Sequence, residues 1–164
     1  MRYFLRMEIS HTNVMGKKDL KELKKQIKNY DLDIKKGYKI SKYKNKFFIV
    51  SSEYPMFFNI NSIFYPTLKF LNENGKVGYK SIVLDEGARK QITRGADVMA
   101  GGIFINKNLC DEYFEGDVVV IMISGEFLAV GIALTGLEPI TESTAGKVVD
   151  IFHYKGDELD NFTI

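Results

Sequence analysis

The sequence is poor in the residues that disulfide-bonded and metal-binding proteins use. It has one cysteine, Cys110, and two histidines, His11 and His153, in 164 residues. A single cysteine cannot build an intramolecular disulfide framework or a thiolate metal site, and it fits a reducing compartment such as the cytoplasm. The histidines stand far apart, without a neighbouring cysteine or a paired acid at ligand spacing. The sequence therefore predicts no metal site, and nothing in it indicates a cofactor.

Catalytic motifs are missing as well. The chain contains no GKS or GKT phosphate loop, no GxGxxG and no GxSxG nucleophile elbow. His153 stands in a strand-like pattern, which is typical of a structural imidazole. The acidic neighbours of Cys110 are expected to raise the pKa of its thiol and to disfavour a nucleophilic thiolate. We therefore expect a protein that is not an enzyme.

Long apolar runs are also absent. No segment approaches the roughly 20 apolar residues that a membrane helix needs. The first residues, MRYFLRMEI, are too short and too charged for the core of a signal peptide. We expect neither secretion nor a membrane partner.

What the chain does have is an uneven distribution of charge. Residues 1–80 contain 17 Lys+Arg against 7 Asp+Glu, whereas residues 81–164 contain 6 against 14, so a net charge of +2 conceals halves of +10 and −8. This asymmetry favours two modules, of which the first suits a polyanion by its bulk charge. Mutual attraction of the halves, or a generally lysine-rich surface, would explain the same numbers, and both alternatives stay open here.

The first half has the hydrophobic periodicity of an α+β module. RYFLRMEIS predicts a strand over residues 2–10, and KKDLKELKKQIKNY has the apolar spacing of a helix over residues 17–30. YKISKYKNKFFIV, residues 38–50, predicts two strands around a turn at 44–46, with FFIV central in the sheet. After Pro66, a short helix is expected to pack Leu68, Phe70 and Leu71.

The second half is dominated by short strands. The Asn/Gly-rich stretch NENGKVG coincides with the change of charge sign and predicts a boundary near residue 76, between domains 1–76 and 77–164. YKSIVLD predicts a strand, Asp85 is expected to cap a helix that runs to about Arg94, and Gly95 to end it. DVVVIMI and EFLAVGIAL flank Ser124-Gly125 as a β-hairpin, and KVVDIFHY, residues 147–154, predicts another strand. This pattern predicts a small mixed β-barrel with one or two short helices.

The order of these features resembles the PUA domain, the RNA-binding module named after pseudouridine synthases and archaeosine transglycosylases. The resemblance covers about residues 78–155 and rests on DEGA, RGADVMAGGI, GDVV and AVGIAL in that order. A basic module ending in IFYPTLKFL directly before such a domain is similar to the family of the malignant-T-cell-amplified-sequence protein and the N-terminal part of ligatin. The implied fold class is α+β, with an N-terminal α+β pre-PUA module followed by the PUA β-barrel.

The resemblance also implies a function. Similar proteins are accessory RNA-binding factors of translation, which implies that this one binds tRNA or small-subunit rRNA on the small ribosomal subunit during initiation or recycling. They often work beside a partner with a translation-initiation SUI1-type domain. In similar PUA domains RNA lies against the helix and the following strand. The resemblance implies that three cations of this chain contact phosphates or bases of the RNA: Arg89, Lys90 and Arg94. It also implies a close-packed wall against the RNA, formed by Gly95, Ala96, Met99, Ala100, Gly101 and Gly102.

Structural roles for these same residues stay open at this stage. Gly95 alone would end a helix, Met99 would fill a core, and the Gly101-Gly102 pair would form a tight turn. Asp97 is expected to orient a backbone turn. Family members commonly have proline at the position of Gly101, giving MAPG or MCPG where this chain has MAGG, which leaves open how preorganised the segment is.

Two other classes of function compete with RNA binding. One is a protein-interaction adaptor with a PUA-like domain of weak RNA affinity, whose partner docks on an aromatic surface around Phe57, Phe58 and Phe64. The acidity of the second half favours this alternative, because phosphate neutralisation supplies much of the affinity for nucleic acid. The other is an RNA-modifying enzyme, which ranks last because the first module offers no catalytic acid, nucleophile or cofactor loop.

Overall fold

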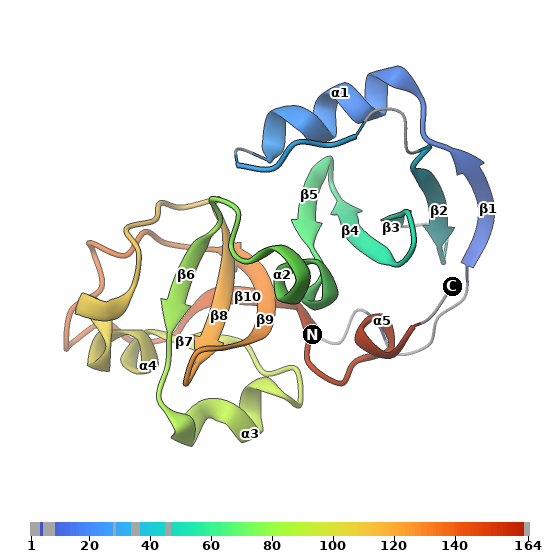
Figure 1. Ribbon diagram of the computed structural model, residues 1–164. Coiled ribbons are helices and arrows are strands. Elements are labelled where there is room, and N and C mark those ends of the chain that lie inside the picture. The colour runs from blue at the N-terminus through green and yellow to red at the C-terminus, as the bar shows by residue number, and fades with distance from the viewer. Residues whose placement is uncertain (1–3, 5–8, 28, 34–36, 45–46, 163–164) are drawn as a thin grey trace.

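The computed structural model describes residues 4, 9–27, 29–33, 37–44 and 47–162, and it contains two five-stranded sheets (Figure 1). The first sheet is antiparallel, in the order β1-β2-β3-β4-β5. Its strands are β1 (Ile9–Val14), β2 (Lys39–Tyr43), β3 (Phe47–Ser51), β4 (Pro55–Ile60) and β5 (Ile63–Pro66). The second has the order β6-β8-β9-β10-β7, with β6 and β8 parallel and the other pairs antiparallel. Its strands are β6 (Lys80–Val83), β7 (Val98–Met99), β8 (Val118–Ile123), β9 (Glu126–Ala133) and β10 (Lys147–Tyr154).

The first module confirms most of the elements predicted for it. Helix α1 (Lys17–Gln26) follows the predicted apolar spacing but ends before Ile27, whose backbone turns extended. β2 and β3 form the predicted pair, and β3 is the central strand of its sheet. Helix α2 (Leu68–Asn74) buries its three predicted apolar residues. Its N-cap is Thr67, whose hydroxyl accepts a hydrogen bond from the Phe70 N–H at 3.1 Å. Most of the strand predicted over residues 2–10 lies outside the described residues. Within them, β1 begins at Ile9.

The second module is mixed α+β, as predicted, and its sheet curls into a half-open barrel (Figure 1). Ser124 and Gly125 both have positive φ, 50° and 77°, which is the geometry of a two-residue turn that matches the twist of β8 and β9. β10 occupies the residues predicted for it. Between β9 and β10 the backbones come so close at Gly131 that an added Cβ would overlap the Asp150 carbonyl oxygen.

The helical segment after β6 differs from the prediction. A 3₁₀ turn, η2 (Glu86–Ala88), precedes a short α3 (Arg89–Ile92), and the Asp85 side chain makes no capping hydrogen bond. Its carboxylate instead accepts a hydrogen bond from the Asn106 amide at 2.6 Å. Gly95 does end the segment, with φ 85°, while its N–H donates to the Ile92 carbonyl and the next N–H donates to the Gln91 carbonyl. This pair of bonds is the glycine-dependent helix stop that the sequence predicted.

The Gly101-Gly102 pair is not a tight turn. Residues Ala100–Ile105 form helix α4, with the glycines in its first turn. Ala100 and Ile103, one helical turn apart, are fully buried, and the Ala100 N–H donates to the Gly146 carbonyl at 2.9 Å. Tertiary burial of this face outweighs the low helix propensity of two glycines. Another 3₁₀ turn, η3 (Lys107–Leu109), follows.

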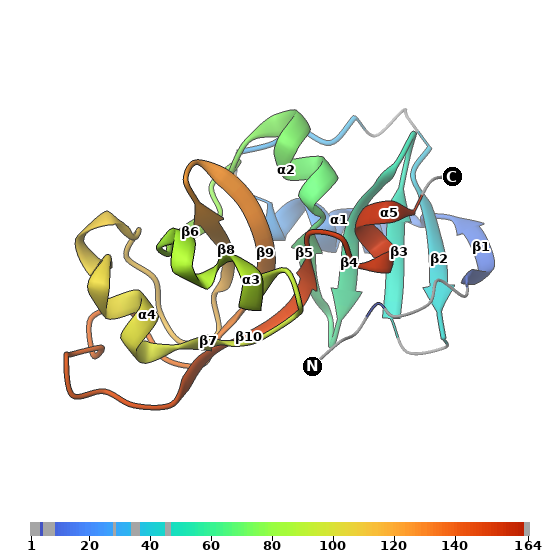
Figure 2. The same ribbon diagram turned by 90° about the horizontal axis from the view of Figure 1, so that it is seen from below.

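A shared core joins the two modules. One hydrophobic cluster contains Phe58 and Leu68 from the first module and Val130, Phe152 and Leu159 from the second. Leu159 belongs to α5 (Glu158–Asn161), which lies against the first sheet (Figure 2). Helix α5 therefore packs against the first module. The domain boundary near residue 76 falls in the connection between α2 and β6 and stays a prediction.

His153 is a structural imidazole, as the strand pattern indicated. It is fully buried, its Nδ1 donates to the Asp157 carboxylate at 2.8 Å, and its Nε2 accepts the Leu68 N–H at 3.0 Å. The ring thus links β10 and the start of α5 to the first residue of α2. Within the described ranges, none of the helices combines the length and the apolar character that crossing a membrane requires.

Candidate functional site

A hollow of about 720 Å³ opens between α3, β7 and α4. Its lining includes three of the residues predicted from the sequence, Ala96, Met99 and Gly102, together with Gly87 and Ile105. Met99 and Ile105 are more than half exposed although they are apolar. The small residues Gly87, Ala96 and Gly102 leave the surface open, and Met99 and Ile105 make it apolar. A flat ligand group could pack closely against such a surface.

Three other predicted wall residues do not line this hollow. Gly95 and Ala100 are buried, so they form the scaffold beneath the surface. Gly101 is exposed on α4, and a Cβ built on it would have no atom within 4 Å. Neither its φ nor its surroundings require glycine. The predicted wall thus divides into a surface part, a buried part and one residue that stands outside the hollow.

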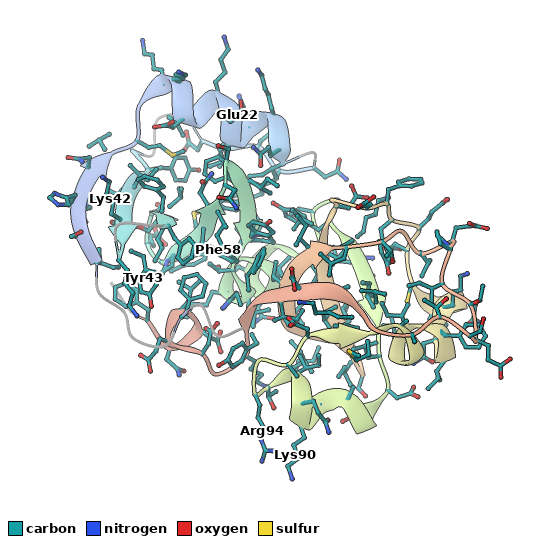
Figure 3. The ribbon with its side chains drawn as sticks, turned by 180° about the vertical axis from the view of Figure 1, so that it is seen from behind. Glu22, Lys42, Tyr43, Phe58, Lys90 and Arg94 are labelled. Carbon is teal, nitrogen blue, oxygen red and sulfur yellow. The ribbon has the colours of Figure 1, made fainter. Side chains whose placement is uncertain are left out.

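The three predicted cations occupy two different environments. Lys90 on α3 and Arg94 in the turn after α3 are exposed, and Figure 3 shows both side chains extending away from the body of the module. Arg89 is partly buried, and carboxylates bind it. Its guanidinium makes two hydrogen bonds of 2.8 Å to Glu86 and one of 3.2 Å to Glu126. A phosphate that approached Arg89 would have to compete with both acids.

The contacts of Arg89 form part of a network that attaches α3 to the β8–β9 hairpin. Glu86 also accepts a hydrogen bond from the Ser124 hydroxyl at 2.8 Å, and Glu126 accepts one from Lys155 at 2.6 Å. Hydrogen bonds from Arg89 and then Ser124 lower the pKa of Glu86 to about 2, and Lys155 is the main cause of a lowered pKa at Glu126. Sequence reasoning missed this network, although the Glu86 and Arg89 spacing of three residues was a visible signal.

Asp97 orients a strand rather than a turn. Its Oδ1 accepts the Ile151 N–H of β10 at 2.8 Å, and its Oδ2 lies 3.6 Å from the Lys147 ammonium. Lys147 also contacts Asp150 at 2.7 Å and stands at the rim of the hollow. The acid therefore fixes β10 beside the short β7 and holds one wall of the hollow in place.

The described residues that line the hollow include no cysteine and no histidine. Burial is the main cause of the raised pKa of the Cys110 thiol, with Asp111 a smaller one, which agrees in direction with the expectation from the sequence. Among the residues that the structure describes, no group of three or more His, Cys, Asp or Glu side chains could hold a metal ion. What the arrangement offers is a shaped apolar surface with cations beside it.

Comparison with known proteins agrees with this architecture. The PUA domain family matches residues 80–155, and the family described as Domain of unknown function (DUF1947) matches residues 12–74. An uncharacterized protein of Methanocaldococcus jannaschii is 34% identical, over 95% of this chain and 99% of its own length. Translation machinery-associated protein 20 of Saccharomyces cerevisiae is 29% identical over 104 residues, 60% of this chain and 57% of the yeast protein. The crystal structure of a hypothetical protein from Pyrococcus horikoshii superimposes with a TM-score of 0.78 at 29% identity, covering 94% of this chain and 100% of that one.

The chain belongs to the malignant-T-cell-amplified-sequence and ligatin-like family of PUA-domain proteins. The hollow lies entirely within the PUA domain, and helix α1 lies in the DUF1947 module, which is the pre-PUA module of this family. The MAGG departure at Gly101 falls in the first turn of α4, outside the hollow.

The pre-PUA module does not present the aromatic surface that a protein adaptor was expected to use. Phe57 and Phe58 are fully buried and Phe64 is 5% exposed. Phe57 and Phe64 face the core beneath α1, whereas Phe58 packs in the core shared with the PUA domain. The prediction of a docking surface at these three residues is therefore wrong, because β4 is covered on both faces.

Proposed function

We propose that this PUA-domain protein binds RNA in the hollow between α3 and α4 and acts as an accessory factor of translation without catalysing a reaction. The observation that carries the proposal is the hollow itself. It lies in a domain of an RNA-binding family, and it is lined by Ala96, Met99 and Gly102. Lys90 is exposed on the adjoining helix α3, and Arg94 is exposed in the turn that follows this helix.

The physical character of the hollow suits an unpaired nucleotide. Its volume lies in the range of small-molecule sites, and its apolar lining would accept the face of a base. Single-stranded RNA presents such faces, whereas the bases of a duplex are stacked and inaccessible. Lys90 and Arg94 would then contact phosphates, which fix position without reading sequence.

The bulk charge of the PUA domain opposes RNA binding, and the pre-PUA module compensates for it. Residues 1–80 carry ten more basic than acidic residues, because 17 Lys+Arg stand against 7 Asp+Glu. A field of this sign attracts RNA over about a Debye length, roughly 8 Å at physiological salt, and raises the association rate without specific contacts. In this proposal the positive charge of the pre-PUA module attracts RNA, and the hollow of the PUA domain recognises the shape of the RNA.

The relative in yeast supports a role in translation. Its name associates it with the translation machinery, and its similarity covers 60% of this chain. We extend the proposal to tRNA or small-subunit rRNA as the RNA, to the small ribosomal subunit as the place of action in the cytoplasm, and to a SUI1-domain protein as a partner. These finer assignments follow from the family resemblance.

Two neighbouring glycines provide a matched test of the hollow. Gly102→Leu would place a side chain in the hollow, whereas Gly101→Leu adds the same side chain to the same helix outside it. Both changes raise helix propensity equally, so stability does not distinguish them. Filter binding of a tRNA to the full chain should show about a tenfold loss for Gly102→Leu and little change for Gly101→Leu. Equal affinities in the two variants would contradict binding in the hollow.

A second experiment tests the cations. Lys90→Gln and Arg94→Gln should each reduce the slope of log K against log salt by about 1, as expected when one phosphate contact is lost. Lys18→Gln on α1 removes one charge far from the hollow and serves as the control. It should lower affinity at low salt without changing the slope by as much. The same slope change in all three variants would show that only net charge matters.

A further inference from the structure

A second hollow, of about 390 Å³, lies on the pre-PUA module along α1. Leu20 and Leu32 form its floor, and Lys17, Lys21 and Lys24 form its rim. We call these five residues the α1 groove. Leu32 is buried and Leu20 is half-buried, while the three lysines are exposed. The groove therefore combines an aliphatic floor with a rim of one charge sign.

The α1 groove lies on the opposite side of the molecule from the RNA site proposed above. In Figure 1 α1 and α3 are at the top and bottom of the molecule, and in the perpendicular view of Figure 2 α3 stands in front while α1 is behind the first sheet. One surface cannot include both the α1 groove and the hollow of the PUA domain. The groove is thus available to a different ligand while RNA occupies the PUA domain.

We propose that the α1 groove binds an acidic, amphipathic segment of a protein partner. Aliphatic side chains of the segment would fill the space between Leu20 and Leu32, and its carboxylates would meet the lysines of the rim. This is the helix-in-groove or extended-segment mode of peptide recognition, in which apolar anchors supply affinity and flanking charges supply orientation and rate.

The chemistry of the floor favours a peptide over a polynucleotide. Proteins that hold single-stranded RNA without sequence preference stack its bases on aromatic side chains in addition to neutralising phosphates. None of the described residues that line the α1 groove has an aromatic ring. Lysines alone would attract RNA, but RNA would leave the accessible part of Leu20 in water, whereas leucine or isoleucine side chains of a peptide would bury it.

The test uses the full chain and labelled synthetic peptides measured by fluorescence anisotropy. The first peptide has leucines at helical spacing between glutamates. The second keeps the glutamates and replaces every leucine by serine, and an oligouridine serves as the polynucleotide probe. Lys21→Glu/Lys24→Glu reverses two charges of the rim. Lys18→Glu/Lys25→Glu reverses two exposed charges of the same helix that do not line the groove.

We expect the leucine peptide to bind the wild-type chain at least about tenfold more tightly than the serine peptide. Lys21→Glu/Lys24→Glu should weaken this binding about tenfold, and Lys18→Glu/Lys25→Glu by no more than about twofold. If tRNA binding weakens, it should weaken equally in the two double variants. Both change the net charge of α1 by the same amount, and only the long-range electrostatic attraction of tRNA is affected. These variants replace exposed residues and should leave the fold intact, which circular dichroism would verify.

Three outcomes would overturn the proposal. Equal binding of the leucine and serine peptides would show that the floor takes no part. A stronger effect of Lys21→Glu/Lys24→Glu than of Lys18→Glu/Lys25→Glu on oligouridine, without an effect on the leucine peptide, would make the groove a polynucleotide surface. No binding of the leucine peptide up to about 1 mM would mean that the groove holds no such segment.

Discussion

The buried His153 offers a direct test of how the two modules are held together. Its ring donates to Asp157 and accepts from the Leu68 N–H, and the edges of Phe4 and Phe58 pack around it at centroid distances of 6.1 and 5.7 Å. His153→Leu approximately preserves volume but can neither donate nor accept. Asp157 would lose its imidazole donor, and the Leu68 N–H would stay buried without an acceptor.

The magnitude follows from the two lost bonds. A hydrogen bond to a charged group contributes about 1.5–3 kcal/mol, and an unsatisfied buried N–H costs about 1–3 kcal/mol. Together they predict that His153→Leu lowers the free energy of unfolding by about 2.5–6 kcal/mol. That is a large share of the roughly 5–15 kcal/mol that stabilises a typical domain. For a chain of this size the melting temperature should fall by roughly 10 °C.

Urea and thermal denaturation followed by circular dichroism would measure the change. His11, the other histidine, provides the control because it is exposed and has a positive φ of 51°, a conformation that asparagine also tolerates. His11→Asn should change the free energy of unfolding by less than about 0.5 kcal/mol. A loss below about 1 kcal/mol for His153→Leu would refute the argument that these buried bonds hold the modules together.

Three further predictions concern single residues. Gly131→Ala should lower the free energy of unfolding by about 3 kcal/mol in urea titrations, because its Cβ would overlap the Asp150 carbonyl oxygen and lie 2.9 Å from the carbonyl carbon; an unchanged midpoint would show that β9 and β10 can separate freely. Gly101→Pro should raise the free energy of unfolding by about 0.4–1 kcal/mol, since proline is tolerated in the first turn of a helix, and should leave tRNA affinity unchanged in filter binding; tighter tRNA binding would instead place Gly101 in the recognition surface. Glu86→Gln should lower the melting temperature at pH 7 and low salt, and the difference from wild type should shrink as the pH falls from about 4.5 toward about 2. The folded-state pKa of Glu86, about 2, lies below its ordinary value of 4.5, so its contribution is present above pH 4.5 and is lost as the pH falls through the folded-state pKa. A difference that stayed constant down to pH 3 would count against the Glu86–Arg89 pair.

Local sequence patterns predicted a large part of the fold. The apolar spacing of α1, the Ser124-Gly125 turn and the helix stop at Gly95 each depend on a few neighbouring residues, so they can be recognised before any contact is known. The hairpin of β4 and β5 was missed, because its turn residues Asn61 and Ser62 do not include the glycine that usually marks positive φ.

The candidate site was predicted less completely, and tertiary contacts are the reason. Nothing in the sequence near Arg89 shows that two carboxylates bind it, because one of them, Glu126, is 37 residues away. Ala100 and Gly95 belong to the predicted wall by composition but are buried by the packing of α4 and α3. Whether a residue is exposed depends on which face of its short helix packs against the core. Two adjacent glycines have no hydrophobic periodicity, so the sequence does not indicate which face that is.

The sequence by itself determined the class of the fold, the uneven charge of the two halves and the extent of the PUA domain, because propensity, charge and ordered motifs are properties of the chain alone. Only the tertiary structure decided which members of that segment are accessible and that Phe57, Phe58 and Phe64 are core residues. It also decided that helix α5 packs against the first module and that α1 and α3 lie on opposite sides of the molecule. These properties arise from contacts between residues far apart in sequence, whose burial is settled by the packing of two sheets and not by any local pattern.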